Sequence, residues 1–230
     1  MTMKTIRSGW LAVLLATSMN ASGAFISDTF DTVHDYCANG VTDTIWDGFL
    51  YNFTNGNATV LAADANTSNA GRLTFRSTYG NWENGDDDGL LLYKSVAGDF
   101  DAQVQVISMN NVTWHDAGIM ARVANLDDAG PGEDWVAVKH FAQGGKNGHR
   151  SVDTNMTSTV EASGLQPWIR LRRTGNVFAS YRSTDGTAWS LIGATLRNDM
   201  AGLAVQVGLW QATFSASQGI ALFDNFSLRV

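Results

Sequence analysis

Apolar and polar residues alternate along short segments of this chain, and turn residues separate the segments. The alternation is strict from residue 100 to 106, so that Phe100, Ala102, Val104 and Val106 share one face. Further segments with a strand pattern are 90–93, 118–123, 135–141, 204–210 and 220–230. Because no segment of the sequence after residue 24 shows a sustained helical period with caps, the pattern predicts an all-β protein.

Residues 168–189 carry the clearest signal for how the strands pair. Two alternating segments flank Gly175 and Asn176, and Asp185 with Gly186 marks a second turn. Short turns built from Gly, Asn and Asp connect antiparallel neighbours. The chain is therefore predicted to form antiparallel sheets, and the short spacing of the strands favours a sandwich over a βαβ fold.

The first residues have the pattern of a secretory signal peptide. Lys4 and Arg7 precede a short apolar run at 10–16, and small residues follow at 21–24. We expect a signal peptide over residues 1–24, with cleavage after Ala24 and one domain over 25–230. No later segment is long and apolar enough to span a bilayer, so the predicted location is secreted, periplasmic or on the cell surface.

Charge and cysteine content exclude several classes of partner and site. The net charge of −7 becomes −9 once Lys4 and Arg7 are removed with the signal peptide. An acidic surface repels phosphate backbones and anionic lipid, which argues against nucleic acid and membranes as partners. The single cysteine, Cys37, rules out an intramolecular disulfide and a cysteine-rich metal site.

Five motifs occur in an order that resembles a known superfamily. They are Gly98-Asp99-Phe100, 117–122, 183–189, 207–209 and 223–228. Together they resemble the concanavalin A-like lectin/glucanase superfamily, a jelly-roll fold shared with laminin-G-type domains, and in particular its secreted bacterial domains of unknown function. The resemblance implies an antiparallel two-sheet jelly-roll sandwich. It does not select a function, because this fold hosts lectins, hydrolases, lyases and adhesive modules.

The acidic residues argue against one catalytic mechanism. Retaining hydrolysis needs two carboxylates about 5–5.5 Å apart. The laminarinase-like branch places them in an E-x-D-x-x-E motif, and none of Glu83, Glu133 and Glu161 has a second Glu within five residues. A lyase would need a base such as His140 and a cation such as Arg122 beside the substrate carboxylate. Enzymatic activity stays undecided, with a non-catalytic protein favoured.

Aromatic and planar polar residues point instead to sugar binding. Sugars bind flat aromatic faces and groups that make paired hydrogen bonds. Trp210 and Gln206 are predicted on the outward face of one strand, and Gly208 between them leaves room for a ligand. The candidate contact residues are Met120, Arg122, Lys139, His140, Gln206 and Trp210. The sequence thus predicts a non-catalytic, lectin-like glycan-binding protein; a polysaccharide-active enzyme and a structural or adhesive surface protein remain alternatives.

A structural calcium ion is the cofactor that the sequence suggests. Asn84, Asp86 and Asp88 supply oxygen ligands at alternate positions before a glycine, as in the first half of a calcium loop. The twelfth position is a serine, which rules out an EF-hand. The superfamily resemblance implies a second candidate, in which Asp28 or Asp31 near the first strand meets Asp224 in the last. Nothing in the sequence indicates the oligomeric state.

Overall fold

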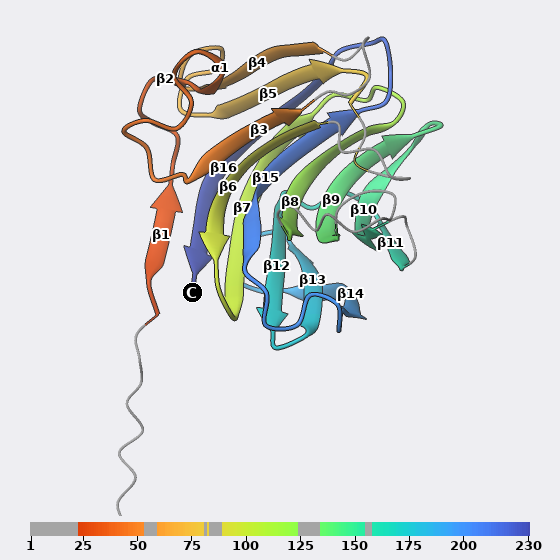
Figure 1. The fold of residues 1–230 in the computed structure, drawn as a ribbon. Coiled ribbons are helices and arrows are strands. Elements are labelled where there is room, and N and C mark those ends of the chain that lie inside the picture. The colour runs from red at the N-terminus through yellow and green to blue at the C-terminus, as the bar shows by residue number, and fades with distance from the viewer. Residues whose placement is uncertain (1–22, 53–58, 81, 83–88, 124–133, 155–157) are drawn as a thin grey trace, which may run out of the picture.

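The structure is a computed structural model that describes residues 23–52, 59–80, 82, 89–123, 134–154 and 158–230 (Figure 1). These residues form sixteen strands and one short helix, α1 (Tyr36–Asn39). None of the helical residues described belongs to a helix that is long and apolar enough to cross a membrane. The predicted signal peptide lies, up to residue 22, outside the described residues.

One sheet has nine strands, all paired antiparallel. Its order is β14-β13-β12-β7-β16-β5-β4-β2, and β1 pairs with the second half of β16. The bounds are β1 (Phe25–Asp28), β2 (His34–Asp35), β4 (Thr59–Ala65), β5 (Leu73–Thr78), β7 (Phe100–Met109), β12 (Trp168–Thr174), β13 (Val177–Ser183), β14 (Ser190–Leu196) and β16 (Gly219–Arg229).

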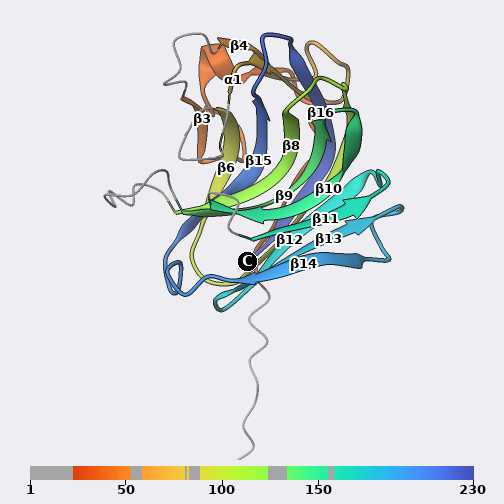
Figure 2. The same cartoon turned by 90° about the vertical axis from the view of Figure 1, so that its right-hand side faces the viewer.

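The other sheet has seven antiparallel strands in the order β11-β10-β9-β8-β15-β6-β3. Figure 2 shows that these strands bend strongly. The bounds are β3 (Gly48–Asn52), β6 (Gly89–Val96), β8 (His115–Arg122), β9 (Trp135–Gln143), β10 (Lys146–Asp153), β11 (Thr159–Ser163) and β15 (Val205–Thr213). The two sheets pack as a sandwich, which confirms the predicted all-β, antiparallel jelly roll.

The main core lies between the two sheets and follows the predicted alternation. From β7, the apolar residues of 100–106 are buried, and from β15 Val205, Val207 and Leu209 meet them from the opposite sheet. Removing apolar side chains from water at about 25 cal/mol per Å² is the dominant favourable term in folding. A chain without a disulfide therefore relies on this layer for its stability.

The hairpin of residues 168–189 forms as predicted. β12 and β13 pair from Trp168 opposite Ser183 to Thr174 opposite Val177, with Gly175 at φ 58° in the turn. The second turn is held by Asp185, whose carboxylate accepts the backbone N–H groups of residues 187 and 188 at 2.8 and 2.9 Å. These hydrogen bonds hold the pKa of Asp185 well below its usual range.

A second buried apolar cluster lies outside this core, on the outer face of the seven-stranded sheet. Its members are Trp82, Leu91, Met120, Trp135, Ala137, Val152, Trp210 and Ala212. An antiparallel sheet that covers a core on one side commonly presents a polar face on the other. An apolar, tryptophan-rich outer face therefore requires an explanation, and it directs attention to this side of the molecule.

Candidate ligand-binding face

Five of the six predicted contact residues share the outer face of three neighbouring strands. In the register, Gln206 of β15 lies opposite Arg122 of β8, and Gly208 lies opposite Met120. Trp210 lies opposite Gly118, which in turn lies opposite Lys139 of β9. We call this surface the tryptophan face; it comprises Trp82, Trp135 and Trp210 with Met120, Arg122, Lys139 and Gln206. The sequence had anticipated the shared face because side chains of a strand alternate between its two sides.

The side chains of the tryptophan face are more deeply buried than those of an open sugar-binding surface would be. Trp210, Met120 and Lys139 are fully buried, Arg122 is nearly so, and Gln206 is partly exposed. The three tryptophans pack with one another and with the apolar residues of β6 and β8. Trp210 lies on the predicted side of its strand but forms the floor of the face instead of an exposed stacking surface.

Two cations lie against the tryptophan rings. The ammonium nitrogen of Lys139 is 2.8 Å from a carboxylate oxygen of Asp116 and 5.7 Å from the centre of the Trp210 ring. The guanidinium of Arg122 is 5.5 Å from the Trp82 ring. A buried charge is tolerated only when it is paired, and the carboxylate and the π-face together provide this for Lys139.

Three polar atoms of the tryptophan face are buried and have no hydrogen-bond partner among the described residues. They are the indole nitrogens of Trp82 and Trp210 and the side-chain oxygen of Gln206. By contrast, the indole nitrogen of Trp46 in the main core donates to Asp28 at 3.0 Å. A buried polar atom without a partner costs about 1–3 kcal/mol, so folded proteins rarely leave one unpaired. Two donors and one acceptor on one face thus lack a partner among the described residues.

The glycine that was expected to make room for a ligand has another role. A Cβ on Gly208 would lie 1.9 Å from the backbone oxygen of Leu92 on β6, so the neighbouring strand occupies that space. Gly89, which was predicted only as part of a loop, instead supports the face. A Cβ there would lie 1.9 Å from the indole nitrogen of Trp82. Trp82 therefore packs directly on the backbone of β6.

His140 does not belong to the tryptophan face, although it was a predicted contact. It alternates with Lys139 and points toward the other sheet, where its ring lies perpendicular to that of His149 at 4.6 Å. The Nε2 atoms of both rings lie 2.9 and 3.0 Å from the backbone oxygen of Gln166. Burial, with the neighbouring His149, lowers the pKa of His140 to about 3. Because His140 lies on the opposite side of the sheet from Arg122, the two side chains do not meet in one site.

An exposed aromatic pair lies at the end of the two central strands of this sheet. Trp114 precedes β8 and is 49% exposed, and Phe214 follows β15 and is 52% exposed. The backbone N–H of Phe214 donates to the carbonyl of Trp114 at 2.9 Å, and Trp114 has φ 63°. A bulky residue in the left-handed region is strained by about 1–3 kcal/mol, which is more frequent at functional sites than elsewhere. The sequence placed Trp114 in a loop but did not reveal this partnership.

The predicted calcium site at the chain ends is not assembled. Asp28 accepts the indole N–H of Trp46 at 3.0 Å, and Asp31 accepts the hydroxyl of Thr29, two residues earlier, at 2.7 Å. Asp224 forms an ion pair with Arg72. Each carboxylate thus has a partner within the protein.

The sequence predicted three other calcium ligands, in the segment that precedes β6. Asn84, Asp86 and Asp88 lie outside the described residues. Within the described ranges, no group of three or more His, Cys, Asp or Glu side chains is arranged to hold a metal ion. Calcium binding at residues 84–88 stays a prediction.

Comparison with known proteins supports the fold and identifies a family. A family model described as "Protein of unknown function (DUF1349)" matches residues 65–230. No curated protein matches the chain. Among solved structures, a functionally unknown protein from Saccharomyces cerevisiae is 21% identical with a TM-score of 0.61, and the match covers 79% of this chain and 95% of that one.

Two enzymes also contain a similar sandwich. A xylan β-1,4-xylosidase from Bacillus halodurans C-125 is 14% identical with a TM-score of 0.63, over 89% of this chain and 39% of the enzyme. A bifunctional GH43-CE protein from Bacteroides eggerthii is 16% identical with a TM-score of 0.57, over 88% of this chain and 25% of that one. This chain therefore spans well under half of either enzyme, and at such identity the likeness concerns the fold alone.

Proposed function

The chain belongs to the DUF1349 family of proteins of unknown function, and from this premise we propose that it is a non-catalytic glycan-binding protein whose ligand contacts the tryptophan face. The observation that carries the proposal is the set of unpaired polar atoms on that face. The indole nitrogens of Trp82 and Trp210 offer two donors, and the side-chain oxygen of Gln206 offers an acceptor. Hydroxyl groups both donate and accept hydrogen bonds, so a polyhydroxylated ligand satisfies all three atoms.

The polar edge of the face is the route by which a ligand reaches these atoms. Gln206 is partly exposed, and Ser95, which lies opposite it on β6, is exposed. On the other side Gln206 lies opposite Arg122, whose guanidinium supplies planar donors. A sugar that enters here meets hydroxyl, amide and guanidinium groups first and the tryptophan rings beneath them.

The ionic partners of nearby carboxylates favour binding over catalysis. Asp116 is paired with Lys139 at 2.8 Å, and Asp134 is paired with Arg197 at 2.8 Å. Both carboxylates are thus already engaged by cations of the protein itself.

The fold and the expected location agree with such a role. Similar sandwiches occur within longer proteins such as the xylosidase, which makes xylan-type glycans sensible first probes. The predicted signal peptide would bring the chain into contact with polysaccharides outside the cytoplasm. Both points are supporting arguments, and the ligand itself is to be found by experiment.

Isothermal titration against a panel of neutral glycans, including xylan fragments, tests the proposal. Trp82→Phe and Trp210→Phe keep an aromatic ring but remove the N–H donor. We expect each to weaken binding about threefold to tenfold, the value of one hydrogen bond. Trp46→Phe is the matched control, because its indole donates to Asp28 in the main core; it should lower stability and leave affinity unchanged.

Two outcomes would overturn the proposal. One is the absence of binding to every glycan in the panel by the folded protein. The other is glycan binding that neither Trp82→Phe nor Trp210→Phe weakens, because the ligand would then lie elsewhere on the molecule.

A further inference from the structure

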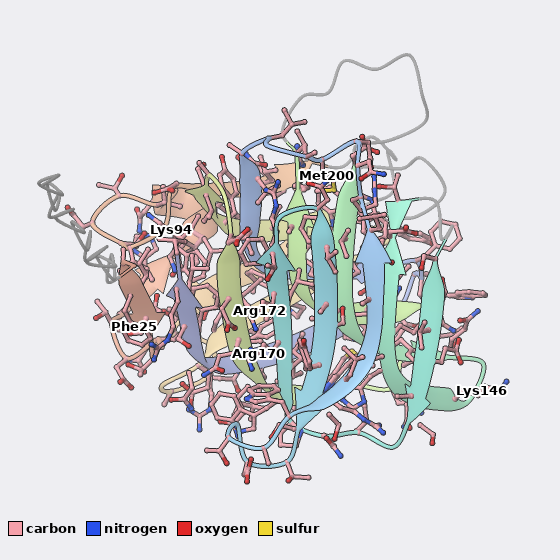
Figure 3. All side chains as sticks on the ribbon, turned by 90° about the horizontal axis from the view of Figure 1, so that it is seen from below. Phe25, Lys94, Lys146, Arg170, Arg172 and Met200 are labelled. Carbon is pink, nitrogen blue, oxygen red and sulfur yellow. The ribbon has the colours of Figure 1, made fainter. Side chains whose placement is uncertain are left out.

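The outer face of the nine-stranded sheet, on the opposite side of the molecule, carries three arginines in neighbouring strands. Arg172 of β12 lies opposite Asp101 of β7, which lies opposite Arg229 of β16. Two residues before Arg172 on β12, Arg170 lies opposite Gln103 of β7. We call this surface the arginine face; it comprises Arg170, Arg172 and Arg229 with Asp101, Gln103, Trp189 and Ser227. Figure 3 views the molecule from this side and labels Arg170 and Arg172.

The charges of this face are unequally paired. Both carboxylate oxygens of Asp101 are bound by Arg170, at 2.6 Å through Nε and by a second bond through Nη2. Arg172 and Arg229 are exposed, and among the described residues no hydrogen bond or ion pair is found for either guanidinium, although that of Arg229 lies 5.1 Å from the centre of the Phe25 ring. Since neighbouring strands are about 4.8 Å apart, the backbones of the two arginines are about 10 Å apart, with Asp101 between them. Because Arg170 neutralises Asp101, the guanidinium groups of Arg172 and Arg229 remain on this face without an ionic partner.

A groove with an aromatic wall runs beside these arginines. It has a volume of about 330 Å³, and Gln103, Arg170, Trp189, Ser227 and Arg229 are among its lining residues. The guanidinium of Arg170 lies 5.4 Å from the Trp189 ring and 5.5 Å from that of Tyr181. Arg170 is thereby fixed by a carboxylate and two rings, and it holds Trp189 at the edge of the groove.

We propose that the arginine face binds a saccharide that bears an oxyanion, the carboxylate or sulfate group of an acidic polysaccharide. Arg172 and Arg229 each present a planar fork of donors that matches such a group. Trp189 offers a surface for the sugar ring, and Gln103 and Ser227 offer neutral partners for its hydroxyls. This site lies on the other sheet from the tryptophan face and does not depend on the function proposed for it.

Binding of the intact protein to polygalacturonate, to dextran sulfate and to neutral dextran tests this inference at low and at physiological salt. We expect binding to at least one of the two anionic polymers, weakening as salt rises, and no binding to dextran at this face. Polygalacturonate alone would identify a carboxylate ligand, and dextran sulfate alone a sulfate ligand. Arg172→Gln and Arg229→Gln should each weaken anionic binding about tenfold. Arg172→Lys keeps the positive charge but lacks the planar fork of donors, so its affinity for the anionic polymer should lie between those of the parent protein and of Arg172→Gln.

Lys146→Gln is the matched control, since it removes one positive charge at the edge of the molecule, away from Arg170 and Arg172 (Figure 3). It should leave anionic binding unchanged. The inference is overturned if neither anionic polymer binds, or if the arginine variants bind like the parent protein. If Arg172→Gln loses anionic binding but still binds neutral glycans, failure of the arginine face is distinguished from failure of the tryptophan face.

Discussion

Acidification from pH 7 to pH 5 should destabilise the folded protein through its buried neutral histidines. His115 is fully buried, with Nδ1 3.0 Å from the backbone oxygen of Asn110 and Nε2 3.0 Å from the side-chain nitrogen of Gln211. These contacts are those of a neutral imidazole that donates through Nδ1 and accepts through Nε2. A proton on Nε2 would face a second donor in an environment without water.

The magnitude follows from the two pKa values of this one group. Burial lowers the pKa of His115 from 6.5 to about 4, although the Asn110 carbonyl acts in the opposite direction. The unfolded chain binds the proton more readily, so the stabilising contribution is complete above pH 6.5 and is lost as the pH falls toward 4. At pH 5 the loss from His115 is about 2 kcal/mol. His140, whose pKa is lowered to about 3, adds a loss in the same direction.

Urea unfolding followed by tryptophan fluorescence at pH 7, 6 and 5 measures this dependence. The parent protein should lose stability at each step, before aspartates begin to titrate near pH 4. In His115→Gln the total loss between pH 7 and pH 5 should be smaller by about 2 kcal/mol, whatever its stability at pH 7. A free energy of unfolding that is constant over this range, or a variant with the full dependence, would refute the reasoning.

Three further predictions concern other parts of the molecule. Arg173→Met should lower the free energy of unfolding by about 3 kcal/mol or more in a thermal melt, because the buried guanidinium donates to three backbone carbonyls, at 2.7 to 3.0 Å, that would lose their partner. Gly89→Ala should displace Trp82, cost about 1–3 kcal/mol and alter the near-UV circular dichroism, whereas an unchanged spectrum would contradict the packing described for Trp82. If calcium binds at residues 84–88, the ion at a hundred times its Kd should stabilise the protein by about 2.7 kcal/mol, and Asp88→Ala should abolish the rise in Tm. An unchanged Tm in calcium and in EDTA would exclude that site.

Much of the candidate site was predictable because strand periodicity is local. The two-residue period puts Met120 and Arg122 on one side of β8, and it puts Trp135 and Lys139 on one side of β9. The register places all four on the tryptophan face. His140 shows the limit of choosing residues by chemical type. As the residue after Lys139, His140 points to the other side of the same strand, and the structure gives it a buried partner in His149.

Other features depended on contacts between distant segments. Gly208 and Gly89 both belong to this sheet, but their surroundings differ. Gly208 lies against the backbone of the neighbouring strand, whereas Gly89 lies against the indole ring of Trp82, and only the tertiary structure shows this difference. In the sequence, Arg170 and Arg172 belong only to the 168–189 hairpin. Only the pairing of β12 with β7 and of β7 with β16 assembles them with Arg229 around Asp101.

The sequence by itself determined the fold class, the antiparallel pairing of the 168–189 hairpin and the side of each strand that faces the core. These properties depend on residues that are close in sequence, through turn chemistry and the two-residue period of a strand. Only the tertiary structure decided that Trp210 is buried, which polar atoms on its face lack partners and where exposed arginines gather. Burial and pairing depend on which strands become neighbours, and that is settled by packing between segments that lie from about ten to more than a hundred residues apart in the sequence.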